Sequence, residues 1–345
     1  MIGHPRLTAA TARVCQQSTP RSNSPLHSYR NTRGLVALAM LVASLLGPLA
    51  SASTVLAYNE QRPVLAYYYA WWDPSNFDRT MFQPAAAYNS DDVGVMQRHV
   101  QQAQSAGIDG FVMSWYGNGD RTDSNLAHLL DVAQNTGFRA TIHFETPHFS
   151  GVDDVIGQLS AFYATRLNHP AMVRYEGRPV IFFWQASKFD NATWDFIRGQ
   201  VDPNHNAVWI ADGDQFGILR GDAWDGISPY AIAWSASPAR QLPSWAAKAA
   251  AVAPDKLWIP PVSPGCNDSA ARATTCARDR GDGAYYQATW DGAVASNPQW
   301  AIIVSTFNEW MESTQIEPSV QYGDEYLQIT RQNADQYRAV TQGNG

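Results

Sequence analysis

The sequence lacks the short motifs that mark three large classes of enzyme. It contains no Gly-x-Ser-x-Gly element of a serine hydrolase, no Walker loop of a nucleoside triphosphatase and no Gly-x-Gly-x-x-Gly fingerprint of a dinucleotide enzyme. Internal repeats and low-complexity runs are also absent after residue 58. The function must therefore be sought in residues that come together through the fold.

Cysteine is scarce as well, since the 345 residues include only three. Cys15 lies in an N-terminal leader, so Cys266 and Cys276 remain, and in an oxidising compartment they can close one short loop as a disulfide. Two cysteines without a histidine cluster make a poor zinc site. His143 lies within one predicted strand and His148 directly follows it, but the first predicted strand lacks the His-x-His pair that barrel metallohydrolases commonly carry. We expect no catalytic metal and no cofactor.

The N-terminal segment contains no acidic residue. Its arginines precede an apolar run at residues 34–50, and Ala-Ser-Ala follows at 50–52, which is the order of a signal peptide. We expect residues 1–52 to be a leader, with cleavage after Ala52 or Ala57, and an uncleaved membrane anchor is the alternative. Residues 58–345 would then form a single secreted domain.

Basic residues are few beyond this leader. Five of the 24 basic residues and none of the 31 acidic ones fall in residues 1–52, so the rest of the chain has 19 basic against 31 acidic residues and a net charge of −12. An acidic surface disfavours nucleic acids and anionic membranes as partners. We expect neither to bind.

Eight short apolar runs recur along the chain, and most of them precede a helical pattern. This alternation predicts an α/β fold, a single-domain (β/α)8 TIM barrel with a parallel sheet. The connection from Gly213 to Asp225 is the exception, because it is too short and turn-rich for a full helix. The predicted strands are Val64–Trp72, Gly110–Gly117, Arg139–Pro147, Pro179–Ala186, Ala207–Asp212, Gly226–Ile232, Leu257–Val262 and Ala301–Glu309.

Polar and aromatic residues gather at the C-terminal ends of these predicted strands, where the active sites of such barrels lie. Flat aromatic faces stack on the apolar faces of pyranose rings, and carboxylates and amides hydrogen-bond sugar hydroxyls. The mixture favours a carbohydrate cleft, although core packing is an equally good interpretation of any single tryptophan. The residues predicted to bind substrate are Tyr69, Trp72, Trp115, Glu145, Trp184, Tyr230, Asn308 and Trp310.

Glu309 and Glu312 are the candidates for a catalytic carboxyl pair. Glycoside hydrolysis usually needs one protonated carboxyl for the leaving oxygen and one ionised carboxyl for the anomeric carbon. A turn after the eighth strand would put both glutamates on one side of the cleft, where two close charges raise one pKa and separate an acid from a base. The alternative is that Glu309 caps a turn and Glu312 is a solvated loop residue. Glu145 is the chief rival for a catalytic role, and we assign it to substrate binding.

Four stretches of the sequence together carry a family resemblance. They are Tyr-Tyr-Ala-Trp-Trp at 68–72, Ala-Gly-Ile-Asp-Gly-Phe-Val-Met-Ser-Trp-Tyr-Gly at 106–117, Ile-His-Phe-Glu at 142–145 and Phe-Asn-Glu-Trp-Met-Glu-Ser-Thr-Gln-Ile-Glu at 307–317. These stretches resemble glycoside hydrolase family 99, the endo-α-mannosidases. The resemblance implies a retaining, endo-acting, metal-independent barrel enzyme that cleaves α-mannosidic linkages in glycans. It also implies that Glu312 is the general acid/base and that Glu309 deprotonates the sugar's own 2-hydroxyl, which attacks the anomeric carbon.

Met311 departs from the family pattern, in which a histidine commonly stands between the tryptophan and the second glutamate. Direct attack by a carboxylate is an alternative to the 2-hydroxyl route, and both retain stereochemistry. Two other functions are compatible with these residues: a non-catalytic carbohydrate-binding barrel, and an enzyme of cell-surface polysaccharide assembly. In each case we expect a monomer whose partner is an oligosaccharide or polysaccharide.

Overall fold

The computed structural model describes residues 61–273 and 276–339. The predicted leader, residues 1–52, lies outside the described residues, as do Cys15 and the alternative cleavage site at Ala57. Within the described part, no helix combines the length and apolar character needed to cross a membrane.

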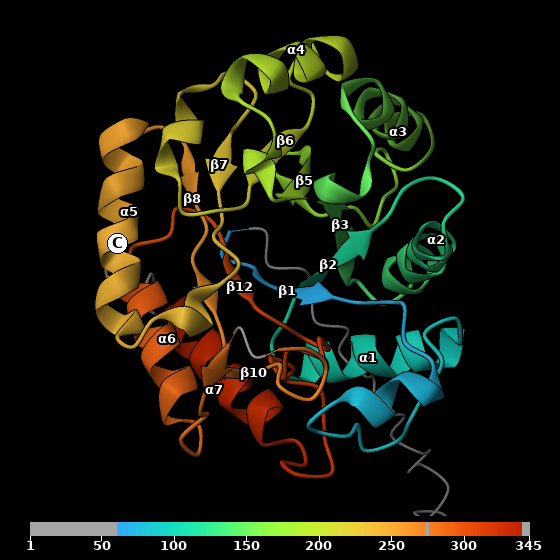
Figure 1. Ribbon diagram of the computed structural model, residues 1–345, viewed down its shortest axis with the longest axis vertical. Helices are drawn as coiled ribbons and strands as arrows, with labels where there is room; N and C mark the ends of the chain where they lie inside the picture. Colours follow the sequence, from blue (N-terminus) through green and yellow to red (C-terminus); the bar gives the residue numbers. More distant parts are fainter. Residues whose placement is uncertain (1–60, 274–275, 340–345) are drawn as a thin grey trace, which may run out of the picture. The chain divides into compact units, whose positions relative to one another are not determined.

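Short parallel strands form an inner ring that helices surround (Figure 1). The strands of this ring are β1 (Val64–Tyr68), β2 (Gly110–Trp115), β3 (Arg139–Glu145), β5 (Arg178–Trp184), β6 (Val208–Ala211), β7 (Gly226–Ile227), β8 (Leu257–Trp258), β9 (Pro261–Val262) and β12 (Ile302–Val304). Their order along the sheet is β8-β7-β6-β5-β3-β2-β1-β12-β9. β8 and β9 are two halves of one segment, and they pair with β7 and β12 respectively, so the ladder returns to its start. The predicted (β/α)8 barrel is confirmed.

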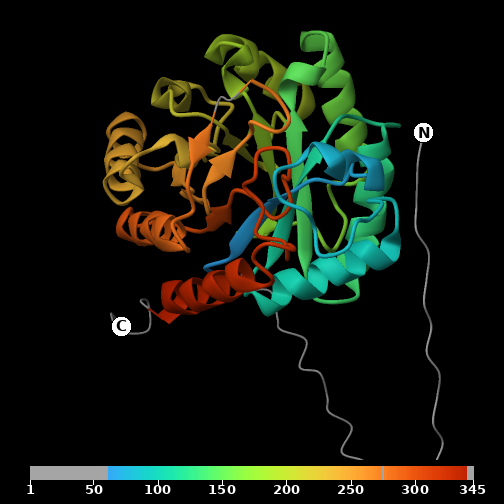
Figure 2. The ribbon, with the colours of Figure 1, turned by 60° about the horizontal axis from the view of Figure 1, so that its bottom comes forward.

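Helices follow most of the strands and cover the outside of the ring. They are α1 (Val93–Ser105), α2 (Arg121–Gln134), α3 (Val152–Thr165), α4 (Asn191–Val201), α5 (Pro238–Val252), α6 (Ala284–Ala295) and α7 (Glu325–Ala339). The Asp92 carboxylate begins α1 by accepting a hydrogen bond of 2.8 Å from the Gly94 N–H. α7 lies beside α1 (Figure 2), so the last helix closes against the first.

The core has two layers because successive strand residues point to opposite faces. In β1, Val64, Ala66 and Tyr68 face the surrounding helices, whereas Leu65 and Tyr67 face the barrel interior. Both sets are almost completely buried, which explains why the strands are apolar nearly throughout.

The connection between β6 and β7 contains only the 3-10 helix η4 (Phe216–Arg220), as its short sequence predicts. The ordered strands are shorter than predicted: β1 ends at Tyr68, and the apolar residues after it pack without joining the ladder. Three short strands were not predicted, namely β4 (Arg174–Tyr175), which pairs with β5, and the hairpin of β10 (Cys266–Asn267) and β11 (Ala277–Arg278).

The predicted disulfide between Cys266 and Cys276 is present and joins residues ten positions apart. It closes the loop between β10 and β11, which we call the disulfide loop (residues 266–278). Asn267 and Arg272 of this loop contact Glu312, which follows β12.

Candidate active site

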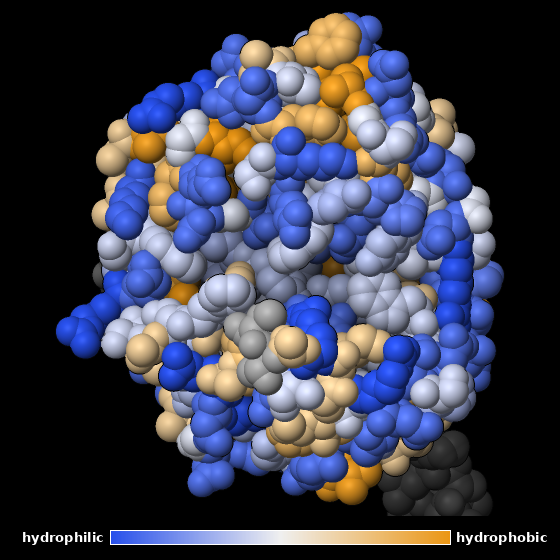
Figure 3. All heavy atoms as spheres, viewed as in Figure 1, coloured by the Kyte–Doolittle hydropathy of each residue, from blue (hydrophilic) through white to orange (hydrophobic). Residues whose placement is uncertain are grey.

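The C-terminal ends of the barrel strands surround a hollow in the middle of one face (Figure 3). We call this hollow the mouth; catalytic residues of (β/α)8 barrels come from the strand ends and loops at this end. The loop after β12 contributes both candidate glutamates, and the disulfide loop lies against that loop, since the Asn267 N–H donates a hydrogen bond of 2.8 Å to the Glu312 carbonyl.

The backbone around Glu309 is fixed by short-range hydrogen bonds. The Asn308 carboxamide accepts from the Tyr69 N–H at 2.7 Å and donates to the Tyr69 carbonyl at 2.8 Å, which joins this loop to the end of β1. The Glu309 N–H donates to the Thr306 hydroxyl at 2.8 Å. Glu309 is therefore held at the seam between the first and last strands.

The Glu309 side chain is buried, with the residue only 7% exposed. One carboxylate oxygen accepts the Met311 N–H at 2.9 Å. Burial, and next the negative charge of Glu312, raise the pKa of Glu309 to about 8. The surroundings thus favour the protonated form of this carboxyl.

Glu312 has a more open environment, with its side chain 28% exposed. One carboxylate oxygen accepts the Tyr230 hydroxyl at 3.2 Å, and the other contacts Arg272 Nη2 at 2.7 Å. The Tyr69 hydroxyl donates in turn to the Tyr230 hydroxyl at 3.0 Å. A chain of two tyrosines therefore leads from β1 to Glu312.

Arg272 belongs to the disulfide loop and bridges two acids. Its Nε lies 2.9 Å from a carboxylate oxygen of Asp268, which is completely buried, while its Nη2 reaches Glu312. The two carboxylates raise the pKa of the guanidinium above its ordinary value. Arg272 is a site residue that the sequence-based prediction missed.

Two further carboxyls approach the mouth from other strands. The Ser114 hydroxyl donates to Glu145 at the end of β3, and burial raises the pKa of Glu145 to about 7. Asp212, after β6, accepts the N–H groups of Tyr230 at 2.8 Å and Gln185 at 3.3 Å, and burial raises its pKa to about 7 as well. The charges of Asp212 and Glu312 both act on Glu145, so the acids form one electrostatic cluster.

Aromatic residues line the space between these carboxyls. Tyr69 is 6% exposed and Tyr230 is 9% exposed, and Trp184 is half-buried at the end of β5. The Trp184 and Tyr230 rings are 5.0 Å apart between centroids. The structure therefore brings Tyr69, Trp184, Tyr230 and Glu145 together with the glutamate pair.

Four other predicted substrate-binding residues lie beneath the surface. Trp72, Trp115, Asn308 and Trp310 have no exposed surface, so they cannot touch a sugar in this conformation. Trp115 belongs to the layer between strands and helices, because its side chain points from β2 toward the surrounding helices. The structure differs from the prediction at these four positions, which support the mouth rather than line it.

The two tryptophans nearest the glutamate loop use their indole N–H groups inside the protein. Trp72 donates to the Asn308 carbonyl at 3.1 Å, and Trp310 donates to Glu317 at 3.1 Å. Glu317 also pairs with the buried His99 at 2.9 Å. This buried polar network holds the loop that carries Glu309 and Glu312.

His143 lies in β3, and His148 ends the 3-10 helix that follows this strand. No cluster of three or more His, Cys, Asp or Glu side chains suited to a metal ion occurs among the residues that the structure describes. His143 is buried against Tyr67, with ring centroids 4.6 Å apart, and burial lowers its pKa to about 3. A neutral, buried imidazole of this kind packs the barrel interior.

A parallel barrel whose mouth combines converging carboxyls with tyrosine and tryptophan side chains has the architecture of a glycoside hydrolase. Comparison with known proteins agrees with this class. The chain belongs to glycosyl hydrolase family 99, whose family model matches residues 65–343.

Its relatives are proteins named for one activity. The chain is 27% identical over 303 residues to the glycoprotein endo-alpha-1,2-mannosidase of Rattus norvegicus, and this alignment covers 76% of the chain and 65% of the rat protein. It is 25% identical over 273 residues to the glycoprotein endo-alpha-1,2-mannosidase-like protein of Homo sapiens, which covers 72% of the chain and 59% of that protein. The chain thus spans somewhat less than two thirds of the length of each.

Solved structures share the fold. The GH99 endo-alpha-mannosidase of Bacteroides thetaiotaomicron matches with a TM-score of 0.74 at 24% identity, covering 82% of this chain and 99% of that one. A GH5_18 protein of Streptomyces cattleya matches with a TM-score of 0.55 at 11% identity, covering 81% of each chain. At these sequence identities, the similarity shows only that the barrel fold is shared.

Proposed function

We propose that this protein is a secreted, endo-acting glycoside hydrolase that cleaves α-mannosidic linkages with retention of stereochemistry. The observation that carries the proposal is the glutamate pair: in a family 99 chain, the loop after β12 holds two interacting carboxyls at the barrel mouth. The names of the relatives support α-1,2-linked mannose as the first substrate to test.

The family resemblance supplies the roles of the two glutamates. In the first step Glu309 takes the proton of the 2-hydroxyl, whose oxygen attacks the anomeric carbon, while Glu312 gives a proton to the departing glycosidic oxygen. In the second step Glu312 takes a proton from water, the water oxygen attacks the anomeric carbon, and Glu309 returns its proton to the 2-oxygen. Two inversions at one carbon give net retention.

The surroundings of each glutamate support these roles. A carboxylate that is hard to ionise, like buried Glu309, is a stronger base when it is ionised. Glu312 is more exposed and so is accessible to the leaving group and to the water of the second step. Tyr69, Tyr230 and Glu145 are the residues available to bind the sugar between them.

Secretion is supported by two features of the chain. The arrangement of residues 1–52 is that of a signal peptide, and the disulfide between Cys266 and Cys276 is stable in an oxidising compartment. Mass spectrometry of the mature N-terminus tests export, because a protein that starts after Ala52 or Ala57 has passed a signal peptidase.

Activity is tested on a panel of α-mannans and α-1,2-linked mannose oligosaccharides, with NMR detection of the first product anomer. We expect internal cleavage and an α-configured product, and loss of cleavage in Glu312→Gln. Glu176→Gln is the matched control, since Glu176 is exposed on the turn before β5, at the opposite end of the barrel. A β-configured product, or binding without any cleavage by the unaltered protein, would contradict the proposal.

A further inference from the structure

A buried acid, Glu317, lies behind the loop that carries the glutamate pair, and its side chain is only 5% exposed. One carboxylate oxygen, Oε2, accepts the Tyr88 hydroxyl at 2.8 Å and the Trp310 indole N–H at 3.1 Å. The other oxygen, Oε1, lies 2.9 Å from His99 Nε2. A buried carboxylate loses its hydration, a cost that an apolar side chain of similar size avoids. The proposed mechanism gives this acid no role, so its role must be sought in its contacts.

Both residues that flank Glu309 are connected to this acid. Trp310 donates to it directly, and the Asn308 carboxamide donates at 3.3 Å to the Tyr88 hydroxyl, which donates in turn to Glu317. The side chains of Asn308 and Trp310 are completely buried. The backbone on each side of Glu309 is therefore anchored, through one side chain, to the same carboxylate oxygen.

Glu317 is itself fixed to the barrel. Its N–H donates to the Phe307 carbonyl at 2.8 Å, just beyond β12. His99, which faces Oε1, belongs to α1, and its Nδ1 lies 3.1 Å from the hydroxyl of Tyr68 in β1. Contacts with β1, α1 and the segment after β12 thus hold the acid, so it can keep its two donors in one place.

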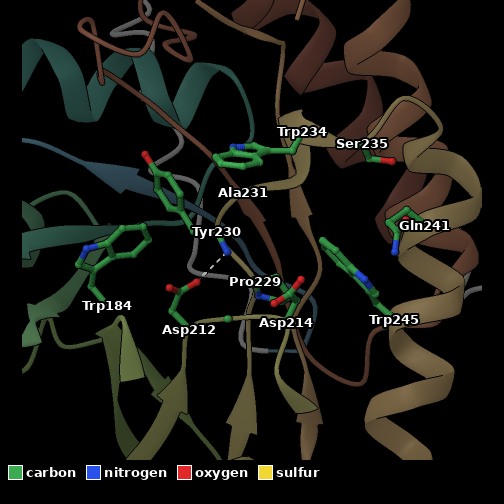
Figure 4. Close-up of a pocket in the computed structure, with 11 residues that line it drawn as sticks. Trp184, Asp212, Asp214, Pro229, Tyr230, Ala231, Trp234, Ser235, Gln241 and Trp245 are labelled. Carbon is green, nitrogen blue, oxygen red and sulfur yellow. Dashed lines mark hydrogen bonds between the residues drawn. The ribbon is translucent and has the colours of Figure 1, made fainter. Parts of the chain in front are cut away.

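The surroundings of Glu312 depend on other residues. Figure 4 shows the hydrogen bond of 2.8 Å that the Tyr230 N–H donates to Asp212, and the Tyr230 hydroxyl contacts Glu312 at 3.2 Å. None of the printed contacts of Glu312 involves Glu317 or Tyr88. A change in the Glu317 contacts should therefore act on Glu309 and leave Glu312 in place.

We propose that Glu317 is a positioning residue that, through Trp310 and Tyr88, holds Glu309 in the orientation from which it takes the proton of the 2-hydroxyl. This inference rests on the proposed function. Proton transfer requires close placement of the carboxylate, and a displacement of about 1 Å lowers a rate by about 100-fold. The buried acid would serve to fix one orientation of the loop, which an apolar side chain could not do.

The first test is kinetic, on α-1,2-linked mannose oligosaccharides well below the melting temperature of each variant. Tyr88→Phe removes the hydroxyl that joins Asn308 to Glu317, and it should lower kcat about tenfold with KM unchanged. Glu317→Leu should lower kcat about 100-fold, and Glu317→Gln should recover most of this loss, because its carboxamide oxygen can replace Oε2. If Glu317→Leu does not fold, Tyr88→Phe and Glu317→Gln provide the test.

Tyr286→Phe is the matched control. Tyr286 is also a buried tyrosine, and its hydroxyl bonds Thr330 at 2.9 Å between α6 and α7, far along the chain from the Glu317 contacts. Its kcat should be unchanged even if its melting temperature falls. Equal kcat losses in Tyr88→Phe and Tyr286→Phe, no loss in Tyr88→Phe, or a Glu317→Gln variant as impaired as Glu317→Leu would overturn the positioning role.

The second test does not need activity. Burial raises the pKa of Glu309 from an ordinary value of 4.5 to about 8, and NMR of the protein with 13C-labelled glutamate carboxyls measures this pKa. In Tyr88→Phe the pKa of Glu309 should fall, because a loosened side chain gains access to water, and in Tyr286→Phe it should stay the same. If the unaltered protein cleaves no glycan, the proposed function fails, and this titration still tests the anchoring of Glu309. An identical Glu309 pKa in Tyr88→Phe and the unaltered protein would overturn it.

Discussion

Glu309 and Glu312 are three residues apart on one loop, yet their surroundings are opposite. Glu309 is buried and held by backbone N–H groups, whereas Glu312 is partly exposed and is held by Tyr230 and by Arg272 of the disulfide loop. Burial raises the pKa of Glu309, whereas Glu312 contacts the Arg272 guanidinium at 2.7 Å. Two carboxyls that are close in the sequence can therefore have very different surroundings.

This difference has a consequence for the proposed mechanism. Burial favours a protonated Glu309 in the molecule without substrate, but the first step needs this carboxyl ionised. Glu309 must therefore give up its proton when the substrate binds.

The largest expected effect separates the two roles. Glu309→Gln and Glu312→Gln should each lower kcat on mannose oligosaccharides by about 100- to 10,000-fold. On a glycoside with an activated phenol, Glu312→Gln should lose much less, because this leaving group departs without a proton, and Glu309→Gln should lose as much as before. Steady-state kinetics on both substrates provide the measurement. The reverse pattern would exchange the roles of the two glutamates.

The disulfide loop contacts Glu312 through Arg272 and Asn267. The double variant Cys266→Ser, Cys276→Ser should lower the free energy of unfolding by about 2 to 3 kcal/mol, as expected for a closed loop of this length. Urea denaturation measures this change. Activity should fall too, because the loop that carries Arg272 is less restrained. An unchanged unfolding midpoint would mean that the loop is held by its other contacts alone.

Burial of Glu309 should make stability depend on pH. Its pKa is raised by folding to about 8, so the native state holds this proton at pH values where the unfolded chain has released it, and stability is lost as pH rises from about 4.5 to 8. Glu309→Gln, which cannot ionise, should therefore raise the free energy of unfolding by about 1 to 3 kcal/mol at pH 8 and hardly at all at pH 4. Thermal unfolding at both pH values tests this, with Glu176→Gln as control. Equal effects at pH 4 and pH 8 would contradict it.

The smallest expected effect belongs to Arg272. Its side chain is 51% exposed, and exposed ion pairs contribute ~1 kcal/mol or less, so Arg272→Met should lower kcat/KM by about fivefold at most. The loss should shrink as salt is added, since ions screen the pair in the unaltered protein. Kinetics over a series of NaCl concentrations measure both effects. A loss of kcat/KM that does not change with NaCl concentration would mean that Arg272 acts through packing.

The barrel could be predicted from the sequence because buried parallel strands are apolar on both faces. All eight predicted runs contain strands of the ring. The short, turn-rich connection after β6 contains only a 3-10 helix. The strand ends were predicted too long, because Tyr69 to Trp72 are as apolar as β1 but pack against the loop after β12. An apolar pattern predicts that a segment is buried, but it does not predict whether the segment pairs with a neighbouring strand.

The candidate site could be predicted only in part. The rule that sites gather at strand ends correctly brought Glu145, Trp184, Tyr230 and the glutamates to one place. It also selected Trp115 and Trp310, because the sequence does not tell which way a loop residue turns. Arg272 was missed because its contact with Glu312 joins two loops 40 residues apart, and no local pattern signals such a pair.

The hydrogen bonds between Asn308 and Tyr69 connect residues 239 positions apart. They place the candidate glutamates at the strand pairing that forms last during synthesis, since β12 must be present before it can pair with β1. An emerging polypeptide that still lacks this strand has neither Glu309 nor a wall to hold it. The candidate site can therefore form only once nearly the whole domain has left the ribosome and the ring has closed.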